Sequence, residues 1–122
     1  MRVLIVEPRK APRRADIPHT LRDMQRTVGG YIEIITPFDD PVVLVCDEEG
    51  KLKGYELNRA IADKDIIAGT FFLAGIDEED LSDLPDDLAE KYEALFWYPQ
   101  VFIRSPRGIL VLSEDGAQEV IG

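Results

Sequence analysis

The sequence predicts an α+β fold: a single domain, residues 1–122, with a mostly antiparallel sheet and two helices packed on it. Apolar runs rich in β-branched residues recur between turn residues, which is typical of strands. Two other segments place apolar residues at helical spacing beside capping residues. A length of 122 residues suits one domain with one core. The order of the first elements, β-β-α-β-β, is also compatible with a β-grasp-like arrangement.

The N-terminal part contains the first strands and the first helix. A continuous apolar run from Val3 to Val6 predicts a strand, and a short second strand is expected near residues 15–17. Thr20 and Asp23 form a capping box, in which the hydroxyl and the carboxylate each accept from a free backbone N–H. The helix that follows should end at Gly29 in the left-handed conformation.

Three more apolar runs fill the middle of the chain. Residues 31–36 and 42–46 are strongly strand-forming, whereas residues 51–65 show no clear period. Residues 66–76 form one apolar run that contains Gly69, and a glycine inside a strand usually marks a bulge or a close approach of another backbone. With the first elements these runs make up a predicted core of residues 2–75.

The C-terminal part is predicted to hold an acidic helix, a hairpin and a tail. Residues 77–84 form an acidic connector, with room for one helical turn, and Pro85 suits the first position of a helix. Strands are expected at residues 101–103 and 109–112, so the helix and hairpin together span residues 77–112. The polar tail, residues 113–122, is expected to fray. The apolar stripe of the helix consists of Leu84, Leu88, Tyr92 and Leu95.

Charge is unevenly distributed along the chain, whose net charge is −10. Residues 1–26 carry seven Lys and Arg against three acids, and residues 27–122 carry seven against twenty-one. Phosphate backbones and anionic membranes bind clustered cations, so direct binding of nucleic acid or membrane by the whole molecule is not expected. The basic N-terminal segment could still contact an acidic ligand.

Two single residues limit the chemistry. Cys46 is the only cysteine and His19 the only histidine, which excludes an intramolecular disulfide, a thiolate cluster and a multi-histidine metal site. Cys46 lies in an apolar strand and is expected to be core, and His19 lacks an obvious nucleophile partner. We expect no metal and no cofactor. The first apolar run, residues 3–6, is too short for a signal peptide or a spanning helix, which predicts a cytoplasmic protein.

Several short motifs in residues 2–75 together resemble a known family. In this order they are similar to domain-of-unknown-function family 3846, small proteins of gut bacteria and of their conjugative elements and phages. The resemblance transfers no catalytic residue, because the family has no established activity, and it implies a mobile-element context. The motifs are Gly29-Gly30-Tyr31-Ile32-Glu33, Pro37-Phe38-Asp39-Asp40, Asp47-Glu48-Glu49-Gly50-Lys51-Leu52, Asn58-Arg59-Ala60 and Asp65-Ile66-Ile67-Ala68-Gly69-Thr70.

The first candidate site is the polar pair Asn58 and Arg59, which lies between predicted strands. A guanidinium beside an amide can hold a carboxylate or phosphate in bidentate fashion, and Thr70 and Tyr31 could complete a site for a small anion such as a nucleotide. The alternative is structural: an arginine paired with a local acid and an asparagine in a turn.

The second candidate site is the acidic segment between residues 77 and 93, where nine acids accompany a single Lys91. Such a face can imitate the phosphates of DNA and bind a basic groove on a host protein. The alternative is a solvated helix whose acids favour its first turn. A non-enzymatic interaction protein is therefore the first hypothesis; an enzyme stays open because so many carboxylates are available, and the oligomeric state is not predicted. The nine acids are Asp77, Glu78, Glu79, Asp80, Asp83, Asp86, Asp87, Glu90 and Glu93.

Overall fold

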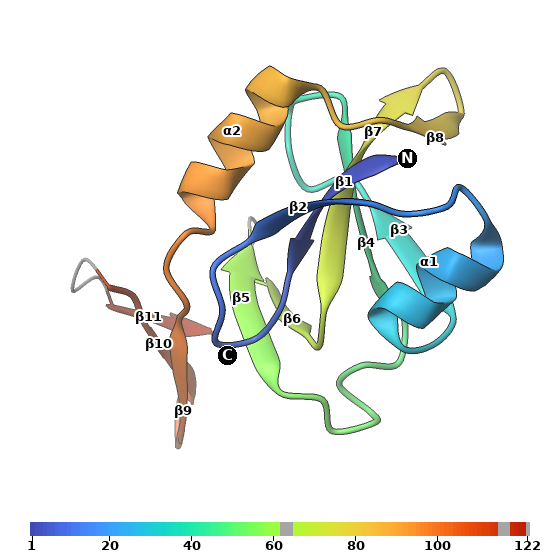
Figure 1. The fold of residues 1–122 in the computed structure, drawn as a ribbon. Coiled ribbons are helices and arrows are strands. Elements are labelled where there is room, and N and C mark those ends of the chain that lie inside the picture. Colours follow the sequence, from blue (N-terminus) through green and yellow to red (C-terminus); the bar gives the residue numbers. More distant parts are fainter. Residues whose placement is uncertain (62–64, 115–117, 122) are drawn as a thin grey trace.

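The computed structural model describes residues 1–61, 65–114 and 118–121. The α+β class is confirmed, because antiparallel strands and two helices make up these residues (Figure 1). The elements are β1 (Arg2–Val6), β2 (Arg13–Asp16), α1 (Leu21–Val28), β3 (Ile32–Ile35), β4 (Val42–Asp47), β5 (Leu57–Ile61), β6 (Asp65–Ala68), β7 (Phe71–Asp77), β8 (Asp80–Ser82), α2 (Asp86–Leu95), β9 (Val101–Ser105), β10 (Gly108–Leu112) and β11 (Gln118–Ile121).

A six-stranded antiparallel sheet forms the centre of the molecule. Its strand order is β2-β1-β7-β4-β3, with β8 paired to the end of β7. The first five elements follow the predicted β-β-α-β-β order, and β7 then lies between the two pairs of strands. The central position of β7 explains its composition, because Phe71, Phe72, Leu73 and Ala74 are all fully buried.

Both faces of this sheet are covered. On one face Val3, Ile5 and Phe72 pack with Met24 and Val28 of α1. On the other face the alternate residues of the same strands pack against α2 and β6, and the two helices lie on opposite sides of the sheet in Figure 1. The second cluster contains Leu4, Val6, Leu44, Phe71, Leu73, Ile67, Ala89, Tyr92 and Phe96.

The predicted ends of α1 are largely confirmed. The Thr20 hydroxyl accepts from the Asp23 N–H at 3.2 Å, and Gly29 ends the helix at φ 97°. The second half of the capping box differs: the Asp23 carboxylate accepts from the Thr20 hydroxyl at 2.6 Å, while the Thr20 N–H donates to the carbonyl of Pro18.

The middle of the chain contains a strand that the sequence does not reveal. Residues 57–61, part of the segment without a period, form β5, which pairs with β6 in a separate two-stranded sheet. The predicted bulge at Gly69 is wrong, because the apolar run divides there into β6 and β7, which belong to different sheets. Gly69 has φ 82°, and a Cβ there would lie 2.6 Å from the Tyr55 ring, so glycine is required at this corner.

The acidic connector of residues 77–84 is not helical. It forms the tight β7–β8 hairpin, in which Asp77 pairs with Asp80. Pro85 is the residue before α2 and caps it without a side-chain hydrogen bond. The predicted stripe is correct for Leu84 and Tyr92, which are 2% exposed, and for Leu88, which is partly buried against the same core. It is wrong for Leu95, the last residue of α2, which is 62% exposed.

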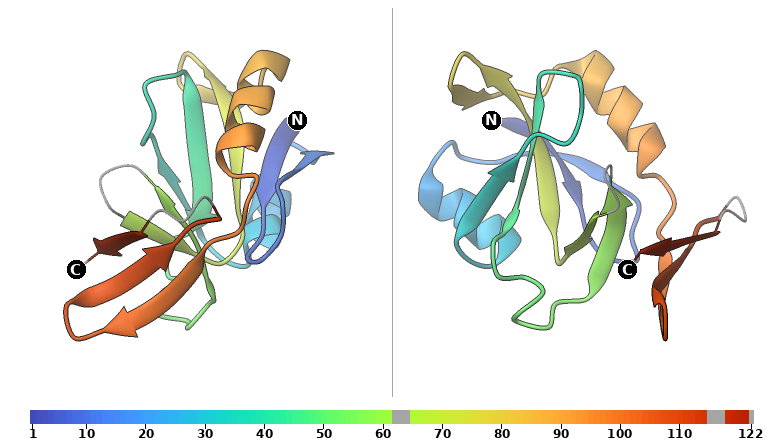
Figure 2. Two further views of the ribbon diagram at one scale, coloured as in Figure 1. Left: turned by 90° about the vertical axis from the view of Figure 1, so that its left-hand side faces the viewer. Right: turned by 180° about the vertical axis from the view of Figure 1, so that it is seen from behind.

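The predicted C-terminal hairpin is confirmed and is extended by a third strand. Part of the expected polar tail forms β11, which pairs with β10 and gives a three-stranded sheet of order β11-β10-β9, hereafter the terminal sheet. Residues 115–117 and 122 of the predicted tail lie outside the described residues. The terminal sheet projects from one side of the central body in Figure 1 and in the right-hand view of Figure 2.

Candidate functional sites

Strand β5 places Asn58 and Arg59 in the interior, where each is 1% exposed. The Asn58 amide nitrogen donates to the carbonyls of Val6 and Gly69, both at 2.9 Å. Asn58 therefore links β5 to the end of β1 and to the corner between β6 and β7. Both of its N–H donors are used by the protein itself.

Arg59 makes five hydrogen bonds, as many as its guanidinium has N–H groups. Nε and Nη2 donate to the Phe96 carbonyl at 3.3 and 2.9 Å, and Nη2 also donates to the Lys10 carbonyl at 2.7 Å. Nη1 donates to the Asn58 carbonyl at 3.2 Å and to Asn58 Oδ1 at 2.9 Å. Arg59 thus joins three segments of the chain, and none of its donors is left for a ligand.

No carboxylate of the described residues forms an ion pair with Arg59. Burial lowers the pKa of its guanidinium to about 10. The Phe96 carbonyl that accepts two of its hydrogen bonds follows the last turn of α2, and a helix carries partial negative charge at this end. The carbonyl at the helix terminus therefore offsets part of the buried positive charge.

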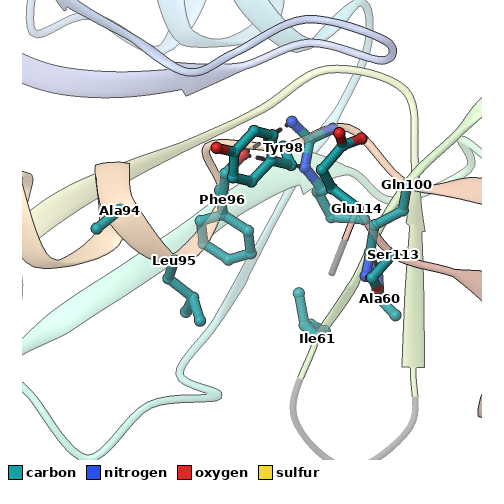
Figure 3. Close-up of a pocket in the computed structure, with 10 residues that line it drawn as sticks. Ala60, Ile61, Ala94, Leu95, Phe96, Tyr98, Gln100, Ser113 and Glu114 are labelled. Carbon is teal, nitrogen blue, oxygen red and sulfur yellow. Dashed lines mark hydrogen bonds between the residues drawn. The ribbon is translucent and has the colours of Figure 1, made fainter. Parts of the chain in front are cut away.

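A pocket of about 480 Å³ lies beside Arg59. Its walls come from β5, from the end of α2 and from the residues that flank the terminal sheet (Figure 3). Gln100 closes one side: its Oε1 accepts from the Ala60 N–H at 2.7 Å and its Nε2 donates to Ser113 Oγ at 3.0 Å. The remaining walls are mainly apolar or aromatic: Ile61, Ala94, Leu95, Phe96 and Tyr98, with Glu114 at the side.

Of the four residues predicted to bind an anion, Arg59 alone lines this pocket. Asn58 is hydrogen-bonded to Arg59 but does not line the pocket. Thr70 is at the corner between β6 and β7, and Tyr31 is a 71% exposed residue after α1. The sequence did not indicate Gln100 or Ser113, because each acts through a contact with a distant segment. The adjacent aromatics Trp97 and Tyr98, 46% and 58% exposed, were an available signal.

The second candidate site is an acidic end of the molecule. The β7–β8 turn, the start of α2 and the β3–β4 loop lie at the same end in every view (Figures 1 and 2). The loop is fixed to α2 because Asp40 accepts from Lys91 Nζ at 2.7 Å and from the Tyr92 hydroxyl at 2.6 Å. We use "acidic end" for the nine predicted acids together with Asp39 and Asp40. The hairpin contributes Asp77, Glu78, Glu79 and Asp80, the segment before α2 contributes Asp83, and α2 contributes Asp86, Asp87, Glu90 and Glu93.

The two bonds to Asp40 change the titration of both partners. The Lys91 ammonium, followed by the Tyr92 hydroxyl, lowers the pKa of the Asp40 carboxyl. Burial, followed by the hydrogen bond to Asp40, raises the pKa of Tyr92. Asp40 therefore stays charged at neutral pH and orients the loop.

The basic N-terminal segment partly neutralises this end. Arg2 lies 3.5 Å from Asp83 and 3.8 Å from Asp86, and Arg14 lies 3.3 Å from Glu93. The charge separation along the sequence is therefore smaller in space, because β1 and β2 lie beside α2. Among ion pairs of the described residues, five of the nine predicted acids have no partner: Asp77, Glu78, Glu79, Asp87 and Glu90.

Residues 1–97 match the model of a protein family described as Domain of unknown function (DUF3846). The chain belongs to this family. The match extends past the motifs that carry the resemblance and includes β8 and α2, so the acidic helix is part of the family domain. The terminal sheet, β9 to β11, lies outside the matched residues. Neither the curated proteins nor the solved structures contain a match to this chain.

Two further observations limit the sites within the described residues. They contain no group of three or more His, Cys, Asp or Glu side chains placed to hold a metal ion. None of the helices in the described part of the chain is long and apolar enough to cross a membrane.

Proposed function

We propose that the protein is a non-enzymatic interaction protein that binds a basic surface of another protein through its acidic end. In the mobile-element or phage context that the family resemblance implies, the partner would be a host protein in the cytoplasm. The observation that carries the proposal is the convergence of acids from three segments, with five of the nine predicted acids lacking an ion-pair partner in the described residues. Clustered exposed carboxylates attract basic surfaces and accelerate association with them.

The β7–β8 hairpin supports this proposal by its conformation. Glu78 has φ 57°, a left-handed conformation that glutamate rarely adopts. A glycine would relieve the conformational cost, but it would remove one of the four consecutive carboxylates of residues 77–80. A glutamate at this position is consistent with a role for its charge.

The test is charge reversal on the exposed face of α2. The variant Asp86→Lys, Asp87→Lys, Glu90→Lys should lose capture of basic proteins from a bacterial host lysate, and capture by the native chain should weaken with added salt. A matched control reverses three exposed acids elsewhere, Glu33, Glu48 and Glu49, and makes the same change in net charge. Equal capture by the first variant and the native chain would contradict the proposal.

A second candidate function is the binding of a small anion such as a nucleotide beside Arg59. It is favoured by a buried cation without a carboxylate partner in the described residues at the wall of a pocket. Because the Arg59 donors are occupied, the affinity would come from its charge and from a ring packed on Tyr98. Thermal shift with a nucleotide panel should show stabilisation that Tyr98→Ala reduces; no stabilisation by any nucleotide would contradict this function.

A further inference from the structure

The terminal sheet has two faces, and its inner face lies toward the β5–β6 sheet. Paired residues of antiparallel strands project to the same face, and successive residues alternate. Arg104 pairs with Ile109, which pairs with Ile121, so that one residue from each of β9, β10 and β11 forms a row across the inner face. Figure 1 and both views of Figure 2 show β11 beside the β5–β6 sheet.

A pocket of about 460 Å³, hereafter the inter-sheet pocket, lies between these two sheets. One wall is the row of Arg104, Ile109 and Ile121, and another wall includes Leu57 of β5 and Ile66 of β6. Ile109, Ile121 and Leu57 are only half-buried, so apolar surface remains accessible in the pocket. Its volume is within the range of small-molecule sites, which often lie at the junction between two structural units.

Gln100 fixes the terminal sheet relative to β5. Its Oε1 accepts from the Ala60 N–H of β5 at 2.7 Å, and its Nε2 donates to Oγ of Ser113, the residue after β10, at 3.0 Å. These two hydrogen bonds join the units that supply the two walls. The inter-sheet pocket is therefore preformed, which lowers the entropic cost of binding a ligand.

The charged side chains that line the inter-sheet pocket are two cations and one acid: Lys51, Arg104 and Asp65. Lys51 Nζ donates to Asp65 Oδ1 at 2.8 Å, and the Ile66 N–H donates to the same oxygen at 2.8 Å. Burial raises the pKa of Asp65, but these donors together lower it below 3.8, so the carboxylate stays charged and neutralises Lys51. Arg104 takes part in no ion pair of the described residues. Its guanidinium is therefore the positive charge that remains for a ligand.

We propose that the inter-sheet pocket binds a small carboxylic acid with an apolar chain, the chain lying between the two sheets and the carboxylate on Arg104. The aliphatic walls remove the chain from water, and a guanidinium holds a carboxylate through two parallel hydrogen bonds.

The charge of the pocket favours a carboxylate over a phosphate. A monoanion matches the single remaining positive charge of Arg104. A phosphate monoester carries about −1.5 to −2 charges at neutral pH. Its second charge would have no cation to pair with among the described lining residues and would be repelled by a chain of net charge −10.

Calorimetric titration of the native chain at neutral pH with octanoate, 1-octanol and octylamine tests the proposal, because these probes share one chain and differ in the charge of the head group. Octanoate should bind at one site and about tenfold more tightly than 1-octanol, the range of a hydrogen bond to a charged group. The net charge of −10 favours the amine everywhere else on the protein. A preference for octylamine, or no binding of octanoate, overturns the proposal. Tighter binding of octyl phosphate than of octanoate overturns the choice of a carboxylate.

Arg104→Gln tests the head-group contact by replacing the guanidinium with a neutral amide. It should weaken octanoate binding about tenfold and leave the affinity for 1-octanol unchanged. The matched control Arg107→Gln removes the same charge from an exposed arginine in the β9–β10 turn, outside the pocket, and should bind octanoate like the native chain. Equal octanoate affinities of the two variants overturn the proposal.

Ile109→Ala tests the chain contact in the middle of the row. It should weaken octanoate and 1-octanol several-fold and by the same factor, because both lose the same apolar contact. Octanoate binding that Ile109→Ala leaves unchanged, or that Tyr98→Ala abolishes in the pocket beside Arg59, overturns the proposal. Thermal unfolding of each variant establishes that it is folded, and the comparison of the probes uses the native chain alone.

Discussion

The central sheet and the terminal sheet use similar residues in different surroundings. In the central sheet both faces of β1, β4 and β7 are covered, one by α1 and the other by α2 and β6. In the terminal sheet only Val111 of the described side chains is buried, on the inner face that lies toward the β5–β6 sheet. On the opposite, outer face Val101, Ile103 and Val120 are 58%, 45% and 47% exposed. The same β-branched sequence pattern therefore stabilises the fold in one sheet and forms a surface in the other. The difference depends on what packs against the strand.

The largest effect is expected in the central sheet. Leu73 of β7 is fully buried and pairs with Leu4 on one side and Leu44 on the other. Leu73→Ala should lower the free energy of unfolding by about 4 kcal/mol, because it removes packed methyl groups and leaves a cavity. Urea denaturation measures it. A loss below about 1 kcal/mol would mean that this sheet is not the stabilising core.

Arg59→Met should lower the free energy of unfolding by about 3 kcal/mol. The substitution leaves the carbonyls of Phe96 and Lys10 without the hydrogen bonds that the guanidinium donates. A buried acceptor without a donor destabilises the folded state. The matched control is Arg22→Met on the exposed side of α1, which should change stability little. Equal effects of the two variants in urea denaturation would show that Arg59 is not a structural link.

Asp47→Asn tests the end of β4. It should lower the free energy of unfolding at pH 7 by about 2 kcal/mol, because a hydrogen bond to a charged group contributes about that much to stability. The buried Asp47 carboxylate accepts from Lys53 Nζ at 2.7 Å and from the Glu49 N–H at 2.8 Å. Burial raises its pKa, but these donors together lower it below 3.8.

The pH dependence of this effect has a definite sign. A carboxyl whose pKa is lower in the folded state than in the unfolded state stabilises the protein fully at pH values above the unfolded-state pKa. This stabilisation is lost as the pH falls through the folded-state pKa. The difference between the native chain and Asp47→Asn should therefore be constant above about pH 5 and shrink below 3.8. Urea denaturation between about pH 7 and about pH 3 measures it; a constant difference would contradict the assignment.

The smallest effect is expected on the outer face of the terminal sheet. Ile103→Thr should change the stability of the monomer by less than about 0.5 kcal/mol, because the side chain is already hydrated. Val111→Thr on the inner face of the adjacent strand places a hydroxyl at a 2% exposed position and should cost more than about 1 kcal/mol. Urea denaturation at low protein concentration measures the free energy of unfolding of both variants. Similar losses of stability in the two variants would show that the outer face is covered in the monomer.

Local sequence signals predicted most of the fold. The apolar runs of β1, β3, β4 and β7 and the caps of α1 follow from short stretches of chain, so they were recognisable. Strand β5 was not, because its consecutive polar residues Asn58 and Arg59 are buried by contacts with distant segments. Polar residues normally indicate solvent, and only the folded chain shows which carbonyls they bind.

The sites were harder to predict for the same reason. The sequence identified the acids between residues 77 and 93, but not that Arg14 lies beside Glu93, 79 positions along the chain. It also did not indicate that Asp39 and Asp40 join the same end. Ion pairs between distant segments depend on the sheet order, which short sequence patterns do not specify.

The position of Phe96 defines a natural boundary in the polypeptide. Its carbonyl is the last acceptor of Arg59 along the chain, and the family match ends at the next residue, 97. A fragment of residues 1–97 therefore contains every hydrogen-bond partner of Arg59. In such a fragment the Ala60 N–H at the edge of β5 would turn to water, because its acceptor, the Gln100 amide, lies beyond the boundary. The terminal sheet can accordingly be regarded as a module joined to a family domain that encloses its own buried cation.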